Sequence, residues 1–399
     1  MTDITVIRTV IPRTIPMTEI FDIIFMNPVL SFDLRNLYAK RNRINKLYHK
    51  SFMNKVATKY KILNESDTDG VILVWPEKHM SSEFSIELEV NYAHIINLLI
   101  HHEIKTYIVV SENNDSSVLI NIRKKNNSNI LKILNYECDD IWIRDYGPLI
   151  STTHIPDQKV GLTFEYNAYG EKYNYNNDKE FPKILKNYFT PKRTYYDEKR
   201  LSSRIVFEFG NLTYNDDICI TNINSIREHN EGRDIVNQIK ILFKDNIHQR
   251  LYFIDCPGIT GDDTDGHIDN LVRLDGKKIL YMGTDYDKHP DFKLLKNLEK
   301  QLLQLRSNLK DDYEFIKINH GANTIMNNSK DDVLPFSYLN YLKVKDIIML
   351  PVPDEIKSKE KNIFSNIFNG KKIEFINSRP FIVEYGGIHC ATLNWYKHE

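Results

Sequence analysis

The sequence has 399 residues, 41% of them hydrophobic, and a formal net charge of −1. This length allows a large buried core in one big α/β domain or two smaller ones, and 23 Tyr and 19 Phe argue against disorder. The balanced charge disfavours nucleic acid or a polybasic membrane surface as partner, and no apolar run of about 18 residues predicts a membrane span.

The four cysteines are widely spaced and form no C-x-x-C pair: Cys138, Cys219, Cys256 and Cys390. A disulfide scaffold or a structural zinc site is therefore disfavoured. Scattered thiols are typical of a reducing compartment, and the N-terminus shows no clear signal peptide. We therefore expect a cytoplasmic protein.

The chain divides into two predicted parts. Residues 1–68 form an N-terminal extension of unknown role, in which a basic stretch at residues 35–59 predicts a helix. Residues 69–399 form the main domain. Here predicted strands and helices alternate, which is typical of an α/β fold.

The elements of the main domain follow from their apolar patterns. Strands are predicted at residues 70–76, 105–111, 160–167, 204–210, 250–258 and 380–387. Helices are predicted where apolar residues recur every three or four positions, at residues 84–102, 234–243 and 290–309. Asp275-Gly276 lies between two apolar segments and predicts a hairpin.

Four short segments combine reactive side chains with turn-forming residues: DDIWIRDYGP (139–148), FEFGNLTYNDD (207–217), DDTDGHIDN (262–270) and EYGGIHCATLNW (384–395). In the first, Trp142 supplies a flat apolar wall near Asp145, but taken alone this segment is better explained as a surface turn with a local Arg–Asp pair. In the second, Glu208 is either a buried, paired carboxylate or a solvent-facing residue of a half-buried strand.

The third and fourth segments contain a histidine and a cysteine. His267 and Asp269 are two positions apart, so on a strand they face the same side, and the carboxylate favours the charged imidazole. An EF-hand loop is excluded, because its first and twelfth positions would be Gly261 and Val272. Cys390 follows two glycines and is either a nucleophile or a small buried hydrophobic residue.

Taken together and in this order, the four segments resemble the agmatine deiminase and bacterial peptidyl-arginine deiminase family of guanidine-modifying enzymes. Other stretches agree: VWP (74–76), EYNAYG (165–170) and TDYDKHP (284–290). The resemblance implies that residues 69–399 form a catalytic domain with the pentein fold, a five-bladed α/β propeller of ββαβ-type units with pseudo-fivefold symmetry. The sequence departs from the family at Phe209-Gly210, where Gly-Gly is frequent, and before Ile388, where an Asn is missing.

The resemblance also implies roles for five residues. Cys390 matches the nucleophile, and His267 matches the general acid and base. Asp145 and Asp269 match the carboxylates that hold the guanidinium, with Trp142 as a further substrate-binding residue. Glu208 matches an acidic position near the catalytic histidine.

These residue types suit hydrolysis of a guanidinium, which is planar, cationic and a poor electrophile. Two carboxylates can bind its N–H edges and fix its plane. A thiolate then attacks the central carbon to give a covalent S-alkylthiouronium, while His267 protonates the departing ammonia and afterwards activates water. No metal or other cofactor is needed.

We therefore expect an agmatine deiminase (agmatine iminohydrolase) that forms N-carbamoylputrescine and ammonia for putrescine and polyamine synthesis. The oligomeric state, monomer or homo-oligomer, stays open. One alternative is a peptidyl-arginine deiminase, disfavoured because the known bacterial type is exported. A second is a non-catalytic pentein-fold binding protein, which would normally lack one of these groups. A third, a metallohydrolase, is disfavoured because His229, His248 and His289 do not have H-x-x-x-H spacing.

Overall fold

The computed structural model describes residues 59–77, 86–114, 116–126, 129–153, 159–189, 196–232, 234–310, 312–353 and 357–396. All of these residues belong to one compact unit, Lys59–Glu399. The helix predicted at residues 35–59 falls, except for its last residue, outside the described part of the chain. The same holds for residues 1–58 of the predicted N-terminal extension.

Most strands of the described residues form five small sheets of three or four strands. In strand order they are β19 (Thr392–Trp395), β2 (Gly70–Val74), β3 (Lys105–Val110), β4 (Leu131–Asn135); β1 (Lys61–Ile62), β5 (Leu149–Thr152), β6 (Lys159–Thr163), β7 (Tyr196–Arg200); β10 (Arg250–Ile254), β9 (Ile218–Asn222), β8 (Thr213–Tyr214); β11 (Val272–Asp275), β12 (Lys278–Gly283), β13 (Glu314–Asn319); and β16 (Leu342–Val344), β17 (Ile347–Val352), β18 (Lys372–Asn377). A separate hairpin joins β14 (Met326–Asn327) to β15 (Val333–Leu334).

The five sheets share one pairing pattern. In each, one strand has an antiparallel neighbour on one side and a parallel neighbour on the other. A parallel neighbour requires a crossover, and helices supply it. The crossover helices are α4 (Ile86–His101), α8 (Asn176–Tyr188), α9 (Ile223–Glu228) with α10 (Ile235–Asn246), α12 (Phe292–Asn308) and α13 (Ser358–Ile367), and the shorter α5 (Ser117–Lys125) joins β3 to its parallel neighbour β4. The fold is therefore mixed α/β, as predicted.

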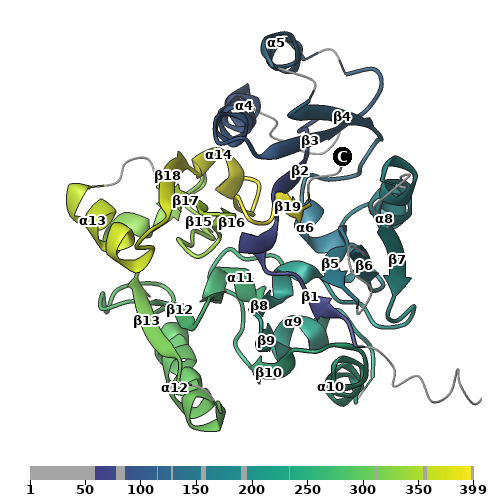
Figure 1. The fold of residues 1–399 in the computed structure, drawn as a ribbon. Coiled ribbons are helices and arrows are strands. Elements are labelled where there is room, and N and C mark those ends of the chain that lie inside the picture. The colour runs from purple at the N-terminus through teal and green to yellow at the C-terminus, as the bar shows by residue number, and fades with distance from the viewer. Residues whose placement is uncertain are drawn as a thin grey trace, which may run out of the picture. The chain divides into compact units, whose positions relative to one another are not determined.

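Short helical segments complete the unit. They are α5 (Ser117–Lys125), α6 (Ile143–Tyr146), α7 (Ala168–Glu171), α11 (Ile268–Leu271), α14 (Arg379–Ile382), η1 (Glu65–Asp67), η2 (Phe209–Asn211) and η3 (Ala322–Thr324). Figure 1 shows α6 and α11 toward the middle of the unit, whereas the crossover helices α4, α8, α10, α12 and α13 lie toward its periphery. Segments that are far apart in sequence are therefore brought together at the middle.

Helix α12 shows how the apolar pattern builds the periphery. Its four leucines at three- and four-residue spacing, Leu295, Leu298, Leu302 and Leu305, are all buried. They join a core that includes Ile279 and Leu280 of the neighbouring strand β12. Burial of one such side chain contributes about 1.5–3 kcal/mol, so this face holds the helix on its sheet.

The two ends of the described chain both pair with interior strands. Strand β19 lies antiparallel to β2 and aligns Thr392 with Leu73. Strand β1 lies antiparallel to β5 and aligns Lys61 with Thr152. Residues 59–68 thus pack within the same unit as the rest of the described chain, and β19 fixes the backbone directly after Cys390 (Figure 1).

Most predicted elements are confirmed, but two strands are wrong. Residues 204–210 contain only an isolated bridge at Val206 and the start of η2, and their apolar side chains Ile205, Phe207 and Phe209 pack into a core cluster without extending a ladder. Residues 380–387 form part of α14 and a turn in place of a strand. Among the residues that the structure describes, no helix is both long and apolar enough to cross a membrane.

Candidate active site

The five predicted catalytic residues are all buried and lie at the ends of short elements. Asp145 is in α6, Glu208 directly precedes η2, His267 caps the start of α11, Asp269 is in α11, and Cys390 precedes β19. The sequence suggested that His267 and Asp269 lie on a strand, but the structure places them at the start of helix α11. His267 has extended backbone angles and Asp269 sits in the helical turn that follows, and the two reach the same centre.

Gly210 marks the point where three of these side chains meet. A Cβ atom placed on Gly210 would lie 2.4 Å from Asp145 Oδ1, 2.7 Å from His267 Nδ1 and 3.4 Å from Asp269 Oδ2. The backbone N–H of Gly210 also donates a hydrogen bond to Asp145 Oδ1, at 2.9 Å. A side chain at this position would therefore fill the space between the three reactive groups.

Asp145 is held in a largely apolar setting by a few polar contacts. Its second oxygen, Oδ2, accepts a hydrogen bond of 2.9 Å from the hydroxyl of Tyr169. Burial raises the pKa of Asp145 to about 7; His267 opposes this rise, whereas Asp269 and Glu208 add to it. Removing a carboxylate from water disfavours its charged form, so this side chain is poised to gain a cation.

His267 lies between two carboxylates. Its Nδ1 is 3.4 Å from Asp145 Oδ1, and its Nε2 is 3.8 Å from Glu208 Oε2. Neither ring nitrogen has a hydrogen bond to another described residue. Burial lowers the pKa of His267, but Asp145 and Glu208 outweigh burial and raise the pKa to about 10. The imidazole is therefore charged at neutral pH and can act as an acid.

Cys390 lies against the second aspartate. Its Sγ is 3.6 Å from Asp269 Oδ2 and accepts a hydrogen bond of 3.1 Å from the amide of Asn340. Burial raises the pKa of the Cys390 thiol well above its usual value, and the charges of Asp269 and Asp145 raise it further. The thiolate therefore needs a positive partner in this site.

Asn340 is a residue that the sequence did not single out. Besides Cys390, its Nδ2 donates to Asn270 Oδ1 at 3.0 Å, and its Oδ1 accepts from the backbone N–H of His389 at 2.9 Å. A Cβ on Gly387 would lie 2.3 Å from this Oδ1, which explains a glycine at that position. Asn340 thus orients both the Cys390 sulfur and the backbone of the loop that carries His389. No local sequence motif predicts these contacts.

Two further histidines each join a pair of carboxylates, and the sequence missed this role for both. His229 Nδ1 is 3.0 Å from Glu208 Oε2, and its Nε2 is 3.1 Å from Asp265 Oδ2. Glu208 is thus buried and paired. Burial raises the pKa of Glu208, but His229 and His267 outweigh burial and place the pKa well below its usual range.

His389 forms the second of these pairs. Its Nδ1 is 2.7 Å from Asp269 Oδ2, and its Nε2 is 2.8 Å from Glu65 Oε1. Glu65 in turn contacts Arg273 Nη2 at 2.5 Å and lies 4.0 Å from Arg144 Nη1. Asp269 has its pKa lowered, because its contact with His389 outweighs burial. The only sequence signal was the position of His389 beside Cys390.

Trp142 lies at the edge of this cluster and is half-buried. Its ring lies so close to the cysteine loop that a Cβ on Gly386 would approach it to 2.4 Å. Its predicted contact with substrate stays a prediction, as do the roles of the other five residues. Among the described residues, no group of three or more His, Cys, Asp and Glu has a geometry that could hold a metal ion.

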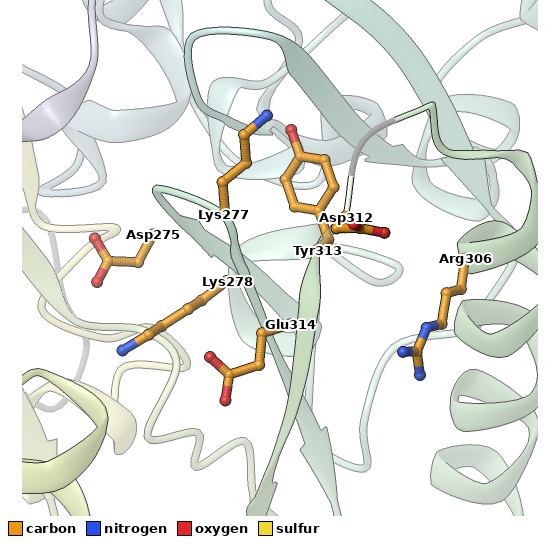
Figure 2. A pocket seen from close by; sticks show the side chains of 7 residues that line it. All are labelled: Asp275, Lys277, Lys278, Arg306, Asp312, Tyr313 and Glu314. Atoms are coloured by element: carbon orange, nitrogen blue, oxygen red, sulfur yellow. The ribbon is translucent and has the colours of Figure 1, made fainter.

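A surface hollow of about 530 Å³ lies elsewhere (Figure 2). It is lined by Asp275, Lys277, Lys278, Arg306, Asp312, Tyr313 and Glu314, none of which belongs to the cluster. Its two lysines already have partners, since Lys277 pairs with Asp217 and Lys278 donates to the carbonyl of Ile367. The hollow is therefore separate from the buried cluster of predicted site residues.

Comparison with known proteins places this cluster in a family context. A curated relative from Vibrio parahaemolyticus, named "Putative agmatine deiminase", is 24% identical over 344 residues, which cover 81% of this chain and 92% of the relative. The solved C. jejuni agmatine deiminase with substrate bound has a TM-score of 0.70 and 18% identity, covering 86% of this chain and 97% of its own.

A second solved structure, agmatine deiminase of Enterococcus faecalis, has a TM-score of 0.70 and 16% identity, covering 85% of this chain and 96% of its own. At these identities the structures show a shared fold. The model of the Porphyromonas-type peptidyl-arginine deiminase family matches residues 63–395, a span that contains all five predicted catalytic residues. The chain belongs to this family, which includes the agmatine deiminases and the bacterial-type peptidyl-arginine deiminases.

Proposed function

We propose that this protein is an agmatine deiminase that converts agmatine to N-carbamoylputrescine and ammonia through a covalent intermediate on Cys390. The convergence of Asp145, His267 and Asp269 around Gly210, beside the Cys390 sulfur, carries this proposal. We further propose that the five sheets are the blades of a closed propeller, and that the product serves putrescine synthesis in the cytoplasm.

The guanidinium would bind between Asp145 and Asp269. Asp269 Oδ1 is buried and has no hydrogen-bond partner among the described residues. Asp269 keeps its charge because His389 lowers its pKa, whereas Asp145, with a pKa of about 7, gains its full charge when a cation arrives. Two carboxylates facing one planar cation fix its orientation and offset the cost of burying its charge.

The same cation would activate the nucleophile. The pKa of Cys390 is raised by burial and by the two aspartates, so a guanidinium between them removes the electrostatic part of that increase. The Asn340 amide adds a hydrogen bond to the sulfur. The bound guanidinium therefore favours the thiolate, which is the form of Cys390 that attacks.

His267 would serve both half-reactions. The Cys390 sulfur attacks the central carbon, and the charged His267 gives its proton to the departing nitrogen, so ammonia leaves and an S-alkylthiouronium remains. Neutral His267 then takes a proton from water as the water attacks. The C–S bond breaks and the ureido product leaves. General acid–base help of this kind contributes about 10²–10⁴-fold.

Agmatine is favoured as the substrate for two reasons. The curated relative and the two solved structures carry that enzyme's name. In addition, two carboxylates beyond the guanidinium site have raised pKa values, because burial and neighbouring acids oppose their ionisation: about 8 for Asp140 and about 6 for Asp263. A second cation on the substrate, such as the agmatine amine, would complement this acidic surrounding.

Product formation by the purified protein tests the proposal. Wild type is expected to form N-carbamoylputrescine from agmatine, Cys390→Ala to form none, and His267→Ala to lose about 10²–10⁴-fold in kcat. Turnover of a blocked arginyl peptide in preference to agmatine would move the assignment to protein citrullination. Agmatine binding in a thermal-shift assay without turnover would indicate a binding protein, and substantial turnover by Cys390→Ala would exclude the covalent route.

A further inference from the structure

A continuous line of ionisable groups runs from His267 to the protein surface. His267 Nε2 is 3.8 Å from Glu208 Oε2, and the same oxygen is 3.0 Å from His229 Nδ1. On its far side, His229 Nε2 is 3.1 Å from Asp265 Oδ2. Carboxylates and imidazoles alternate along this line. Each proton transfer is therefore a short step between neighbouring groups, and no charge has to cross the buried region alone.

The two ends of the line differ in exposure. The side chains of His267, Glu208 and His229 are at most 2% exposed, whereas that of Asp265 is 34% exposed and pairs with Lys172 Nζ at 2.8 Å. Asp265 therefore connects a buried imidazole to solvent. Its backbone is left-handed, with φ of 58°, a conformation that Asp and Asn tolerate better than most residues.

The groups that face His229 favour a proton on it. Burial lowers the pKa of His229, but Glu208 outweighs burial, and Asp265 also raises the pKa. His267 opposes the rise, and the ring of Tyr169 packs edge-on at 6.3 Å between ring centres. The charged His229 can thus release its Nε2 proton toward Asp265 and take a proton from Glu208 at Nδ1.

The reaction itself requires such an exit. A cationic guanidinium and one water enter, and a neutral ureido product, ammonia and one proton leave. In the first half-reaction a C–S bond forms, a C–N bond breaks, and ammonia takes the proton of His267. In the second, a C–O bond forms, the C–S bond breaks with the sulfur leaving as a thiolate that serves the next cycle, and His267 regains one proton from water. The second proton of that water is then lost from the ureido product and must leave the buried site.

We propose that His229 and Asp265 are the exit for this proton, which passes from the site through Glu208 to the surface. This inference rests on the proposed deimination. His229 is accordingly a relay residue that touches neither substrate nor sulfur. The His267–Glu208 separation of 3.8 Å is longer than a hydrogen bond, and catalytic contacts of this kind often tighten only when substrate binds.

His229→Asn and Asp265→Asn test the relay. We expect kcat to fall about 10²-fold for His229→Asn and about 10-fold for Asp265→Asn, with KM nearly unchanged, because only proton release is slowed. The blocked step lies in the second half-reaction, so mass spectrometry of acid-quenched enzyme is expected to show the Cys390 thiouronium accumulating. Asp255→Asn is the matched control, since Asp255 is an exposed aspartate that pairs only with Arg227 among ionised groups that the structure describes.

Added imidazole is expected to restore part of the kcat of His229→Asn, because a small base can occupy the space of the missing ring. A merely structural role would instead raise KM or lower stability without accumulation of the adduct, and that pattern would overturn the relay. Asp265→Asn keeps the test decisive if His229→Asn does not fold, because Asp265 is partly exposed and Asn suits its backbone.

One further measurement needs no substrate. The pH midpoint of hydrogen exchange at the C2–H of His229 reports the titration of that imidazole, and it is expected to fall in Asp265→Asn but not in Asp255→Asn. An unchanged midpoint would overturn the link between His229 and the surface. A wild type that turns over no guanidine would overturn the proposed function, while this exchange measurement would still decide whether the line of groups is coupled.

Discussion

Two imidazoles in this protein, His229 and His389, each contact two carboxylates, yet they work in opposite surroundings. The bridge of His229 runs from Glu208 to the half-exposed Asp265. The bridge of His389 runs from Asp269 to Glu65, and behind Glu65 lie buried arginines in place of solvent. The first is open to water and the second is closed.

Their pKa values move apart accordingly. The pKa of His229 is raised, chiefly by Glu208 against burial, whereas burial and the two guanidinium groups lower that of His389 despite its carboxylates. The same three-group motif therefore serves two purposes. In the proposed mechanism a proton leaves through the open bridge, whereas the closed bridge fixes the charge and position of Asp269 at the proposed guanidinium site.

The closed bridge is expected to matter most for stability. Glu65→Gln keeps the size of the side chain but leaves Arg273 and Arg144 without their shared carboxylate. We expect a loss of about 3–5 kcal/mol in the free energy of unfolding, measured by urea denaturation. Asp265→Asn on the open bridge is the control and should lose less than about 1 kcal/mol. Equal losses of unfolding free energy in the two variants would contradict the difference proposed between the closed and the open bridge.

Gly210→Ala should disrupt the point where Asp145, His267 and Asp269 meet. Its new methyl would collide with Asp145 Oδ1 and His267 Nδ1 and press toward Asp269. We expect kcat/KM to fall about 10²-fold or more, because displacement of catalytic groups by about 1 Å has that effect. Gly276→Ala, which meets no atom within 4 Å, is the control and should keep full activity despite its strained φ of 59°.

The two bridges should also give opposite pH dependence of stability. Because the folded pKa of His229 is raised, its contribution is full below the unfolded value of about 6.5 and is lost as pH rises through the folded pKa. The cost of His229→Asn should therefore shrink with rising pH. The pKa of His389 is lowered, so wild type should gain stability relative to His389→Asn as pH rises toward about 6.5. Urea unfolding at pH 5 to 9 measures both.

The smallest effect is expected at the outer end of the open bridge. Lys172→Met removes the exposed partner of Asp265 and should change the free energy of unfolding by less than about 1 kcal/mol, because water screens this pair. Added salt should reproduce the same change in wild type. A loss of several kcal/mol, measured by the same urea denaturation, would show that Lys172 is more than a surface partner.

Local patterns predicted the periphery of this fold well. The leucine spacing of α12 and the Asp275-Gly276 hairpin need only neighbouring residues, and the structure has both. The strand predicted at residues 204–210 is wrong because Ile205, Phe207 and Phe209 are buried in a core cluster although only Val206 pairs with another segment, in a single bridge. An apolar run that packs into a core therefore looks like a strand in sequence without forming one.

The candidate site also contains residues that local patterns predict and residues that they do not. The five residues named from motifs meet in one cluster, because each motif joins a reactive group to a turn that can face inward. Glu65, His229, Asn340 and His389 were not predictable, since their roles come from contacts across the chain. Glu65 and His389 are 324 positions apart, and no spacing rule reaches that far.

The pairing of β19 with β2 has a consequence for biogenesis. During synthesis on a ribosome, β2 and Glu65 emerge long before the segment that carries His389 and Cys390. Until that segment is made, β2 lacks its antiparallel neighbour β19 and Glu65 lacks its contact with His389. Contacts of such sequence separation close slowly and late. The Cys390 thiol therefore gains its carboxylate and amide neighbours only after the C-terminal segment has been synthesised and has packed against the rest of the unit.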